Sequence, residues 1–129
     1  MNDTTGTSTS EKVRAPTLRE LISLRDAIYP QLRSTSAVRV HAKYSARQGA
    51  GGFRIEIVDA AGQCVKGIDM QLYTEVGGFV FGLVEMRYPQ WHQDAGAHGH
   101  VDWDLKTDEL QHQHRQRIEH VVTYDRSGL

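Results

Sequence analysis

The stretch from Trp91 to Asp104, WHQDAGAHGHVDWD, carries the residue types from which metal sites and acid–base sites are built. It holds three of the seven histidines of the chain together with three aspartates, and two further histidines follow within ten residues. Imidazole and carboxylate groups bind zinc or transfer protons when several of them converge on one point. One hypothesis is therefore a metal-dependent hydrolase or nuclease, with candidate ligands His100, Asp102, His112 and His114.

Strand alternation argues against that convergence. Val101, Trp103 and Leu105 alternate with polar residues, which is typical of a half-buried strand. With a four-residue turn at KTDE, the predicted cross-strand pairs are Leu105 with Leu110, Trp103 with His112 and Val101 with His114. The other register parity would turn every side chain over and place Leu110 on the polar face. The sequence therefore places the two halves of the supposed site on opposite faces of a sheet, and we predict no metal and no cofactor.

The two groups of residues then have separate structural explanations. His112 and His114 are expected to be partly buried near a sheet edge, against Trp103 and the helices. Asp102 and Asp104 are expected to form a charged cross-strand ladder with arginines of the next strand, Arg115 and Arg117.

The preceding residues predict the elements that position this segment. Thr17 and Glu20 form a capping-box pattern at the start of an amphipathic helix, which Pro30 should bend or end near Tyr29. Two alternating segments, AVRVHAKYSA and FRIEIVDAAGQCV, predict an antiparallel hairpin. Between Ile68 and Met86 the aromatic and valine residues favour a strand, whereas apolar residues at steps of three and four favour a helix. We predict the helix, capped by Asp69 and ending before Pro89. Its glycines at positions 77, 78 and 82 are expected to permit close packing.

The order helix, hairpin, helix, hairpin predicts an α+β fold, in which two helices pack on one face of an antiparallel sheet. Residues 1–15 contain almost nothing apolar and are expected to form a flexible tail, and residues 16–129 are expected to form one domain. The apolar segment Ile118 to Tyr124 predicts an edge strand, through which a homodimer is an open alternative.

The composition narrows the function classes without selecting one. The chain has 129 residues, a formal net charge of -1 and one cysteine. The net charge gives no global bias toward nucleic acid. A single cysteine excludes an internal disulfide. Such a cysteine is more typical of a small core residue than of a nucleophile. Without a signal peptide pattern or a long apolar run, we expect a cytoplasmic protein. The sequence contains no Walker loop, nucleophile elbow or His-Glu-x-x-His motif.

Basic residues on the first hairpin support a separate hypothesis. Arg39, Lys43 and Arg54 fall at positions that should face solvent, with His41 and Arg47 nearby. Such a face could contact the phosphates of a nucleic acid, although charges on a solvated strand face often have no ligand.

The segment from Gly67 to Ile118 resembles an uncharacterised bacterial domain family that is carried on plasmids and integrated elements. The resemblance rests on a tryptophan after a helix, a glycine-containing loop and an aromatic-Asp pair in the following strand: Trp91, Gly96, Ala97, Gly99, Trp103 and Asp104. His98 departs from it, because the family has an aromatic residue there. The family implies no known reaction, and its setting implies an accessory or counter-defence protein that works by binding.

We therefore expect a small non-enzymatic module that binds another protein, for a phage or mobile element. Aromatic residues on loops are typical anchors in protein interfaces. The predicted contact residues surround the glycine-containing loop: Tyr88, Trp91, His92, Asp94 and His98. The alternative for Trp91 is that it fills the end of the core beneath the glycine turn.

Overall fold

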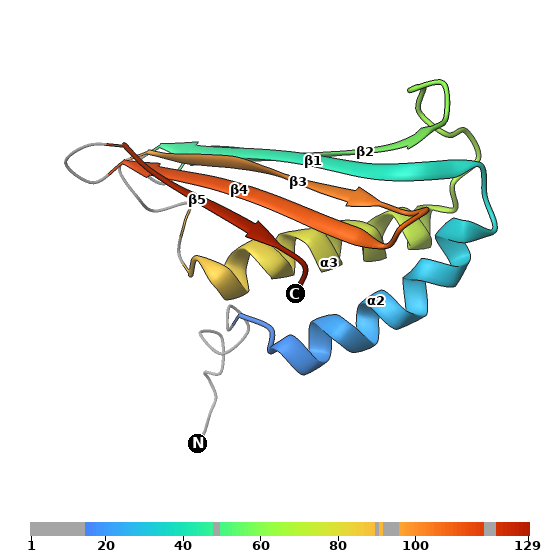
Figure 1. Cartoon of the computed structure of the whole chain (residues 1–129), viewed down its shortest axis with the longest axis horizontal. Helices are drawn as coiled ribbons and strands as arrows, with labels where there is room; N and C mark the ends of the chain where they lie inside the picture. The colour runs from blue at the N-terminus through green and yellow to red at the C-terminus, as the bar shows by residue number, and fades with distance from the viewer. Residues whose placement is uncertain (1–14, 48–49, 90, 92–95, 118–120) are drawn as a thin grey trace, which may run out of the picture.

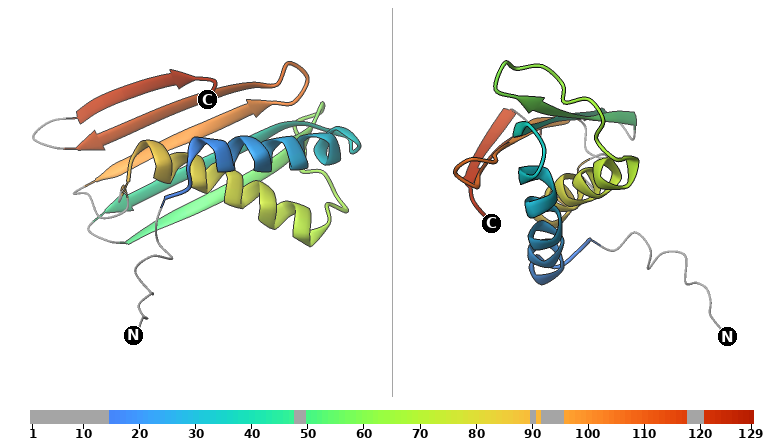
Figure 2. Two further views of the ribbon diagram at one scale, coloured as in Figure 1. Left: turned by 90° about the horizontal axis from the view of Figure 1, so that it is seen from below. Right: turned by 90° about the vertical axis from the view of Figure 1, so that its right-hand side faces the viewer.

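The structure, a computed structural model, describes residues 15–47, 50–89, 91, 96–117 and 121–129. The elements along the chain are α2 (Leu18–Arg33), β1 (Ala37–Arg47), β2 (Ala50–Asp59), α3 (Met70–Arg87), β3 (Ala97–Asp104), β4 (Glu109–Arg117) and β5 (Val121–Ser127). All five strands form one antiparallel sheet in the order β2-β1-β3-β4-β5. Both helices lie on the same face of that sheet (Figure 1, Figure 2). The predicted α+β class is confirmed, and β5 lies at an edge of the sheet, as predicted for that part of the chain.

Helix α2 begins as its sequence predicts. The side chain of Thr17 accepts a hydrogen bond from the backbone N–H of Glu20 at 3.1 Å. The backbone N–H of Thr17 donates in return to the Glu20 carboxylate at 2.8 Å. This reciprocal arrangement satisfies backbone donors that would otherwise lack partners at a helix start.

Of the two predicted effects of Pro30, an end of the helix near Tyr29 is wrong, because α2 continues to Arg33; a bend there stays a prediction. A proline inside a helix removes one backbone hydrogen bond and costs about 3 kcal/mol. Ile28 and Leu32, on either side of Pro30, are fully buried in the core. Burial of each such side chain contributes about 1.5–3 kcal/mol, which offsets the cost of the proline.

Strands β1 and β2 form the predicted hairpin, and their side chains alternate between the two faces of the sheet. Val40, Ala42 and Tyr44 are buried under the helices. The residues between them, Arg39, His41 and Lys43, face the side that carries no helix. The sheet therefore has a covered face, on which the helices pack, and an open face.

Helix α3 confirms the predicted second helix and ends before Pro89. Asp69 occupies the N-cap position, but its side chain makes no capping hydrogen bond, so this part of the prediction is wrong. Two of the three glycines permit close packing. A Cβ at Gly82 would lie 3.0 Å from Leu21 Cδ2, and one at Gly77 would lie 3.3 Å from Ile55 Cδ1. A Cβ at the third, Gly78, would have no atom within 4 Å.

Strands β3 and β4 pair in a register two residues away from the predicted one. Trp103 lies opposite Leu110, Val101 opposite His112 and Gly99 opposite His114. A shift of two residues keeps every side chain on its predicted face. The assignment of faces is confirmed, and the predicted pairs are wrong.

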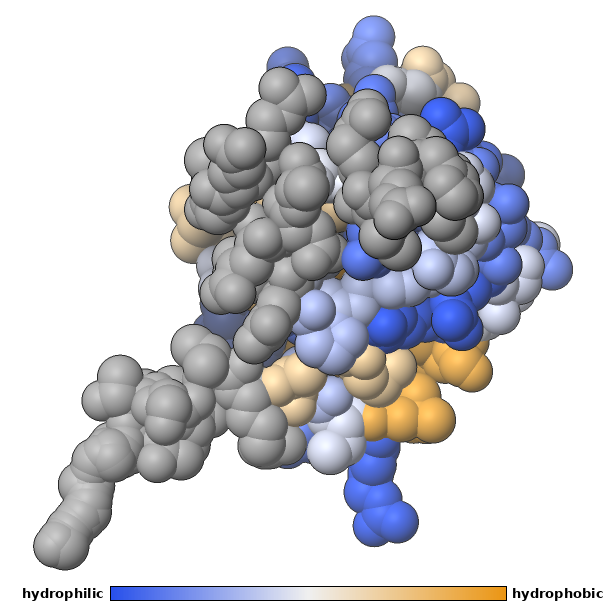
Figure 3. Space-filling view, turned by 90° about the vertical axis from the view of Figure 1, so that its left-hand side faces the viewer, coloured by the Kyte–Doolittle hydropathy of each residue, from blue (hydrophilic) through white to orange (hydrophobic). Residues whose placement is uncertain are grey.

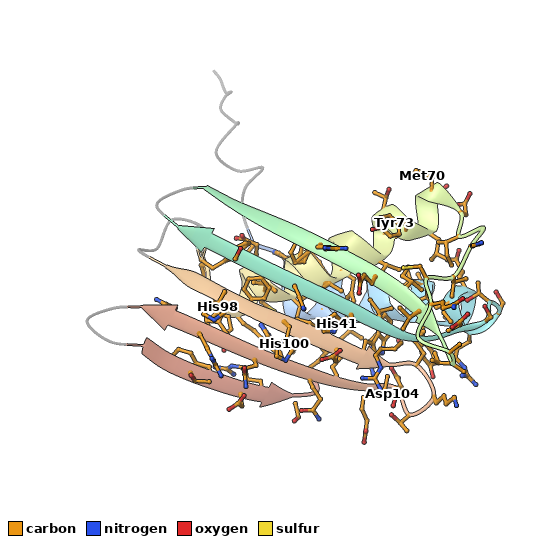
Figure 4. The ribbon with its side chains drawn as sticks, turned by 90° about the horizontal axis from the view of Figure 1, so that it is seen from above. His41, Met70, Tyr73, His98, His100 and Asp104 are labelled. Carbon is orange, nitrogen blue, oxygen red and sulfur yellow. The ribbon has the colours of Figure 1, made fainter. Side chains whose placement is uncertain are left out.

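The two edges of the sheet differ. Along β2, the Tyr73 hydroxyl donates to the Ile55 carbonyl at 3.0 Å, and the Val65 N–H donates to the Ile57 carbonyl at 2.9 Å. Figure 4 shows Tyr73 and Met70 on α3, next to this edge. Such contacts occupy backbone groups that could otherwise recruit another strand. At the other edge lies β5, and pairing with a second copy there stays a prediction.

Hydrophilic and apolar surfaces are also separated. In Figure 3, hydrophilic side chains cover the sheet side, and apolar side chains gather below them on the side of the helices. Neither α2 nor α3 combines the length and the apolar character that a membrane crossing requires.

Candidate functional site

The five histidines that the structure describes are divided between the two faces of the sheet. His112 and His114 are on the covered face and are 2% and 0% exposed. His41, His98 and His100 are on the open face, where Figure 4 shows them along two neighbouring strands. The two sets therefore have different environments and must be considered separately.

On the covered face, the hydroxyl of Tyr44 lies between the two buried imidazoles. It is 2.8 Å from His112 Nε2 and 2.6 Å from His114 Nδ1. Arg87 donates to His112 Nδ1 at 3.1 Å, so the proton of a neutral His112 must be on Nε2 and is donated to Tyr44. The hydroxyl proton of Tyr44 is then donated to His114 Nδ1. His114 Nε2, 3.4 Å from Gln116 Oε1, completes a chain with a single direction.

Gly99 makes room for this chain. Tyr44 projects from β1 and must pass β3 to reach His112 and His114 on β4, and Gly99 is its register partner on β3. A Cβ at Gly99 would lie 2.5 Å from the Tyr44 hydroxyl and 2.3 Å from the Gln113 carbonyl oxygen. Only glycine fits there without displacement of backbone, which gives a physical reason for one glycine of the WHQDAGAHGH segment.

Burial keeps the side chains of His112 and Tyr44 neutral. It lowers the pKa of His112 from 6.5 to about 3, and the positive charge of Arg87 adds to that shift. Burial also raises the pKa of Tyr44 above its usual value of 10. The ring nitrogens of His112 and His114 are already engaged in hydrogen bonds, so this network acts as a structural element of the core. The expectation of partial burial is corrected, because the two histidines are buried, with ring contacts to Tyr44 and Tyr88.

Trp91 belongs to the same core. It is 3% exposed, and its ring meets that of Tyr44 edge-on with a centroid distance of 4.9 Å. The hypothesis of an exposed Trp91 anchor is wrong, and its alternative, a tryptophan that fills the end of the core, is confirmed. Tyr88 is half-buried and stacks on His114 at a centroid distance of 3.8 Å, while its hydroxyl accepts from Arg126 Nε at 2.9 Å.

The remaining predicted contact residues are only partly placed. His92 and Asp94 lie outside the described residues. Gly96 is half-buried and Ala97 is buried at the start of β3. His98 is in β3 and not in a loop, and its side chain is exposed on the open face. Of the predicted loop surface, His98 alone is thus described as accessible.

The open face carries a hollow with a positive lining. Its volume is about 660 Å³, and its lining includes three permanent cations from three strands, Lys43, Arg54 and Arg115. His98 and His100 line it as well, and none of the described lining residues is acidic. Two of the three predicted nucleic-acid contacts, Lys43 and Arg54, therefore lie together. The third, Arg39, lies toward the opposite end of the strands, opposite Asp104.

Asp102 is the centre of a second group on the open face. His41 Nδ1 lies 2.5 Å from Asp102 Oδ1, and His100 Nε2 lies 4.0 Å from Asp102 Oδ2. Arg39 Nη1 is 3.9 Å from Asp102 Oδ1. The rings of His41 and His100 are stacked with a centroid distance of 6.1 Å. This group spans β1 and β3, and the sequence prediction did not include His41 as a partner of Asp102.

The predicted ladder with Arg115 and Arg117 is wrong for Asp102 because of the register. Arg115 is opposite His98, four residues along the strand from Asp102. Asp104 instead accepts hydrogen bonds from the backbone N–H groups of Lys106 and Thr107 at 2.9 and 3.3 Å. These bonds are the main reason that the pKa of Asp104 is lowered.

The alternative metal ligands do not come together. His112 and His114 face the covered side, whereas His100 and Asp102 face the open side. Within the described ranges, no group of three or more His, Cys, Asp or Glu side chains is arranged to hold a metal ion. Cys64, expected in the core, is exposed, which corrects that prediction.

Comparisons with protein-family models, with curated proteins and with solved structures gave no match for this chain. The resemblance to the mobile-element family therefore stays a prediction, and the function must be argued from the geometry.

Proposed function

We propose that the protein binds single-stranded nucleic acid through its phosphate backbone, at the cationic hollow of the open sheet face. The observation that carries the proposal is the joint presence of Lys43, Arg54 and Arg115 in one hollow whose described lining has no acidic residue. The whole chain has a net charge of -1, so the lining of this hollow differs in sign from the molecule as a whole. A concentrated positive surface attracts phosphates even when the net charge does not.

The layout of the cations favours a polymer over a small anion. Arg54, Lys43 and His100 are aligned across β2, β1 and β3, because Lys43 is the register partner of both others. Neighbouring strands are about 4.8 Å apart, so this row extends roughly 10 Å across the sheet. Arg115 extends the cationic surface onto β4. A strand of nucleic acid that crosses the sheet would place successive phosphates against these groups.

The open face also indicates how such a ligand would be recognised. Alternation sends the aromatic side chains of Tyr44 and Phe53 to the covered side, where their rings are 6.2 Å apart. The described outward positions at this end are polar, charged or glycine. Nucleic-acid-binding sheets that read bases do so through exposed aromatic rings. We therefore expect binding through charge, with weak sequence preference and strong salt dependence.

The earlier hypothesis of a protein-binding loop has less support, because Trp91 is in the core and Tyr88 is half-buried. A role as a counter-defence or accessory factor of a mobile element is compatible with nucleic-acid binding and stays a prediction.

The test is fluorescence anisotropy with a labelled single-stranded oligodeoxynucleotide of mixed sequence, measured over a range of salt concentrations. If three cations contact phosphates, the slope of log K against log salt concentration is expected to be roughly -2. A triple variant, Lys43→Glu, Arg54→Glu and Arg115→Glu, should weaken binding by about 100-fold or more, because each charge-assisted contact contributes about 1 kcal/mol or more.

The matched control has the same change in net charge on other surfaces: Arg19→Glu, Arg33→Glu and Lys66→Glu, all at exposed positions. It should lose much less affinity than the triple variant on the open face. Equal losses in the two triple variants would show that only net charge matters, and the proposed site would be wrong.

A further inference from the structure

We propose that His41 and His100 form a metal-independent acid–base pair that cleaves RNA held on the open face. The inference rests on the proposed function, since it requires a phosphodiester at the cationic hollow. It adds a reaction, for which the 2′-hydroxyl of RNA is the nucleophile.

His41 carries a proton on Nδ1 and is held in one orientation. Asp102 can only accept a hydrogen bond when ionised, so Nδ1 of His41, 2.5 Å from Asp102 Oδ1, must carry a proton. In the neutral ring, Nε2 then has a free lone pair. Both side chains are about three-quarters buried, at 26% and 25% exposed, so the pair is held in place and still reached by solvent. An imidazole that is oriented by a carboxylate in this way is suited to act as a general base.

A second imidazole, that of His100, lies beside His41. The ring of His100 is stacked on that of His41, with a centroid distance of 6.1 Å. Cleavage of a phosphodiester by its own 2′-hydroxyl needs one group to remove a proton and another to supply one. An imidazole can both accept and donate a proton, so two adjacent imidazoles can fill the two roles.

The cationic side chains of Lys43 and Arg54 lie next to both histidines. His100 lines the cationic hollow, and His41 lines a smaller hollow of about 90 Å³ beside it. Lys43 and Arg54 line both hollows, so the two adjoin. Glu56 is the acidic residue at the smaller one and lies 3.6 Å from Arg54. A phosphate held by Lys43 and Arg54 would be next to both imidazoles, and the cations would stabilise the negative charge that develops on its oxygens.

The reaction balances without any co-reactant. His41 Nε2 takes the proton of the 2′-hydroxyl, and the 2′-oxygen forms a bond to the adjacent phosphorus. The bond from phosphorus to the 5′-oxygen breaks, and the leaving oxygen takes a proton from protonated His100. The products are a 2′,3′-cyclic phosphate and a 5′-hydroxyl end, and solvent restores the protons. Asp102 acts as a positioning residue for His41.

The experiment uses the whole chain and two probes of one sequence, an RNA oligonucleotide and its 2′-deoxy equivalent, both in the presence of EDTA. We expect the RNA to be cut to products with 2′,3′-cyclic phosphate ends and the DNA to be bound intact. His41→Ala and His100→Ala should each lower the cleavage rate by at least roughly 100-fold, with little change in DNA affinity for His41→Ala. Gln111→Ala, at an exposed position on the same face opposite Asp102, is the matched control and should cleave at the wild-type rate.

Two additional readouts separate catalysis from loss of structure. Melting temperatures of the variants should fall by only about 5 °C or less, because the substituted side chains lie outside the hydrophobic core. Asp102→Asn should change the pH profile of the cleavage rate as well as lower it, since it alters the partner of the general base.

The possible outcomes are distinct. Bound DNA with intact RNA would overturn the acid–base pair and leave the proposed function standing. No binding of either probe would overturn both. Cleavage that appears only when EDTA is replaced by a divalent metal, or that proceeds equally in the His41 and His100 variants, would also overturn the inference.

Discussion

The two faces of one sheet use the same residue types in opposite ways. On the covered face, Tyr44 joins His112 and His114 in a hydrogen-bond chain. On the open face, Asp102 holds Nδ1 of His41 and leaves Nε2 free. The difference lies in what surrounds the rings. The buried rings of His112 and His114 have their nitrogens engaged in hydrogen bonds within the core, whereas the rings on the open face can be reached by solvent and by a ligand. A histidine-rich stretch thus contains both a core network and an accessible site.

The largest expected effect concerns the room that Gly99 provides for the covered network. Gly99→Ala should destabilise the protein by about 3 kcal/mol, because the added Cβ would meet the Tyr44 hydroxyl and a backbone oxygen well inside van der Waals contact. Urea denaturation measures the change. Gly52→Ala, in β2 with nothing within 4 Å of the added atom, is the control and should change the stability by less than about 1 kcal/mol. Equal effects would mean that the close approach is not important.

A smaller effect is expected when the centre of the chain is removed. Tyr44→Phe leaves His112 Nε2 and His114 Nδ1 without their shared partner inside the core, and an unpaired buried polar group costs about 1–3 kcal/mol. Tyr73→Phe removes a hydroxyl from an exposed tyrosine that bonds one backbone carbonyl, and it should cost about 0.5 kcal/mol. If the two variants unfold at the same urea concentration, the network has no special role in stability.

The smallest effect is a dependence on pH. The pKa of His112 is about 3 in the folded protein and 6.5 without burial, so the unfolded chain takes up a proton first as the pH falls. Stability from this group is complete above pH 6.5 and decreases as the pH falls toward 3, by about 1.4 kcal/mol at pH 5.5.

The comparison that isolates this effect is His112→Gln against His41→Gln, each followed by urea denaturation from pH 8 to pH 5. His112→Gln should flatten the decrease in stability with falling pH, whereas His41→Gln should retain it. A decrease that is unchanged in His112→Gln would assign the acid sensitivity to other groups.

Local patterns in the sequence predicted the helices and strands. The register between strands depends on contacts between residues far apart in the chain, which local patterns do not show. The capping box of Thr17 and Glu20 and the alternation of the strands depend on residues close together in the chain. In the turn between β3 and β4, Asp108 has a positive φ of 59°, and its Oδ1 lies 2.7 Å from Nη2 of Arg25 in α2, a contact between residues far apart in the chain. Two registers put the same side chains on the same faces, so alternation alone could not choose between them.

The candidate site shows the same division. The sequence placed His100 and Asp102 on the polar face, and it placed His41 and Lys43 on the polar face of another hairpin. These polar faces adjoin because β1 pairs with β3 as well as with β2. In the chain, β2 and α3 lie between β1 and β3. Strand order is decided by packing of the whole core, and therefore neither the pair of His41 with Asp102 nor the cationic hollow was predicted. The signal that the sequence did contain was the set of charged residues at outward positions of the two hairpins.

The most direct test of the separation between the two faces is an NMR measurement of the imidazole nitrogens during addition of the single-stranded oligodeoxynucleotide at fixed pH and low salt. We expect the resonances of His98 and His100 to shift as the ligand binds and those of His112 and His114 to stay where they are. Shifts confined to the buried pair, or no shift on the open face at saturating ligand, would contradict it.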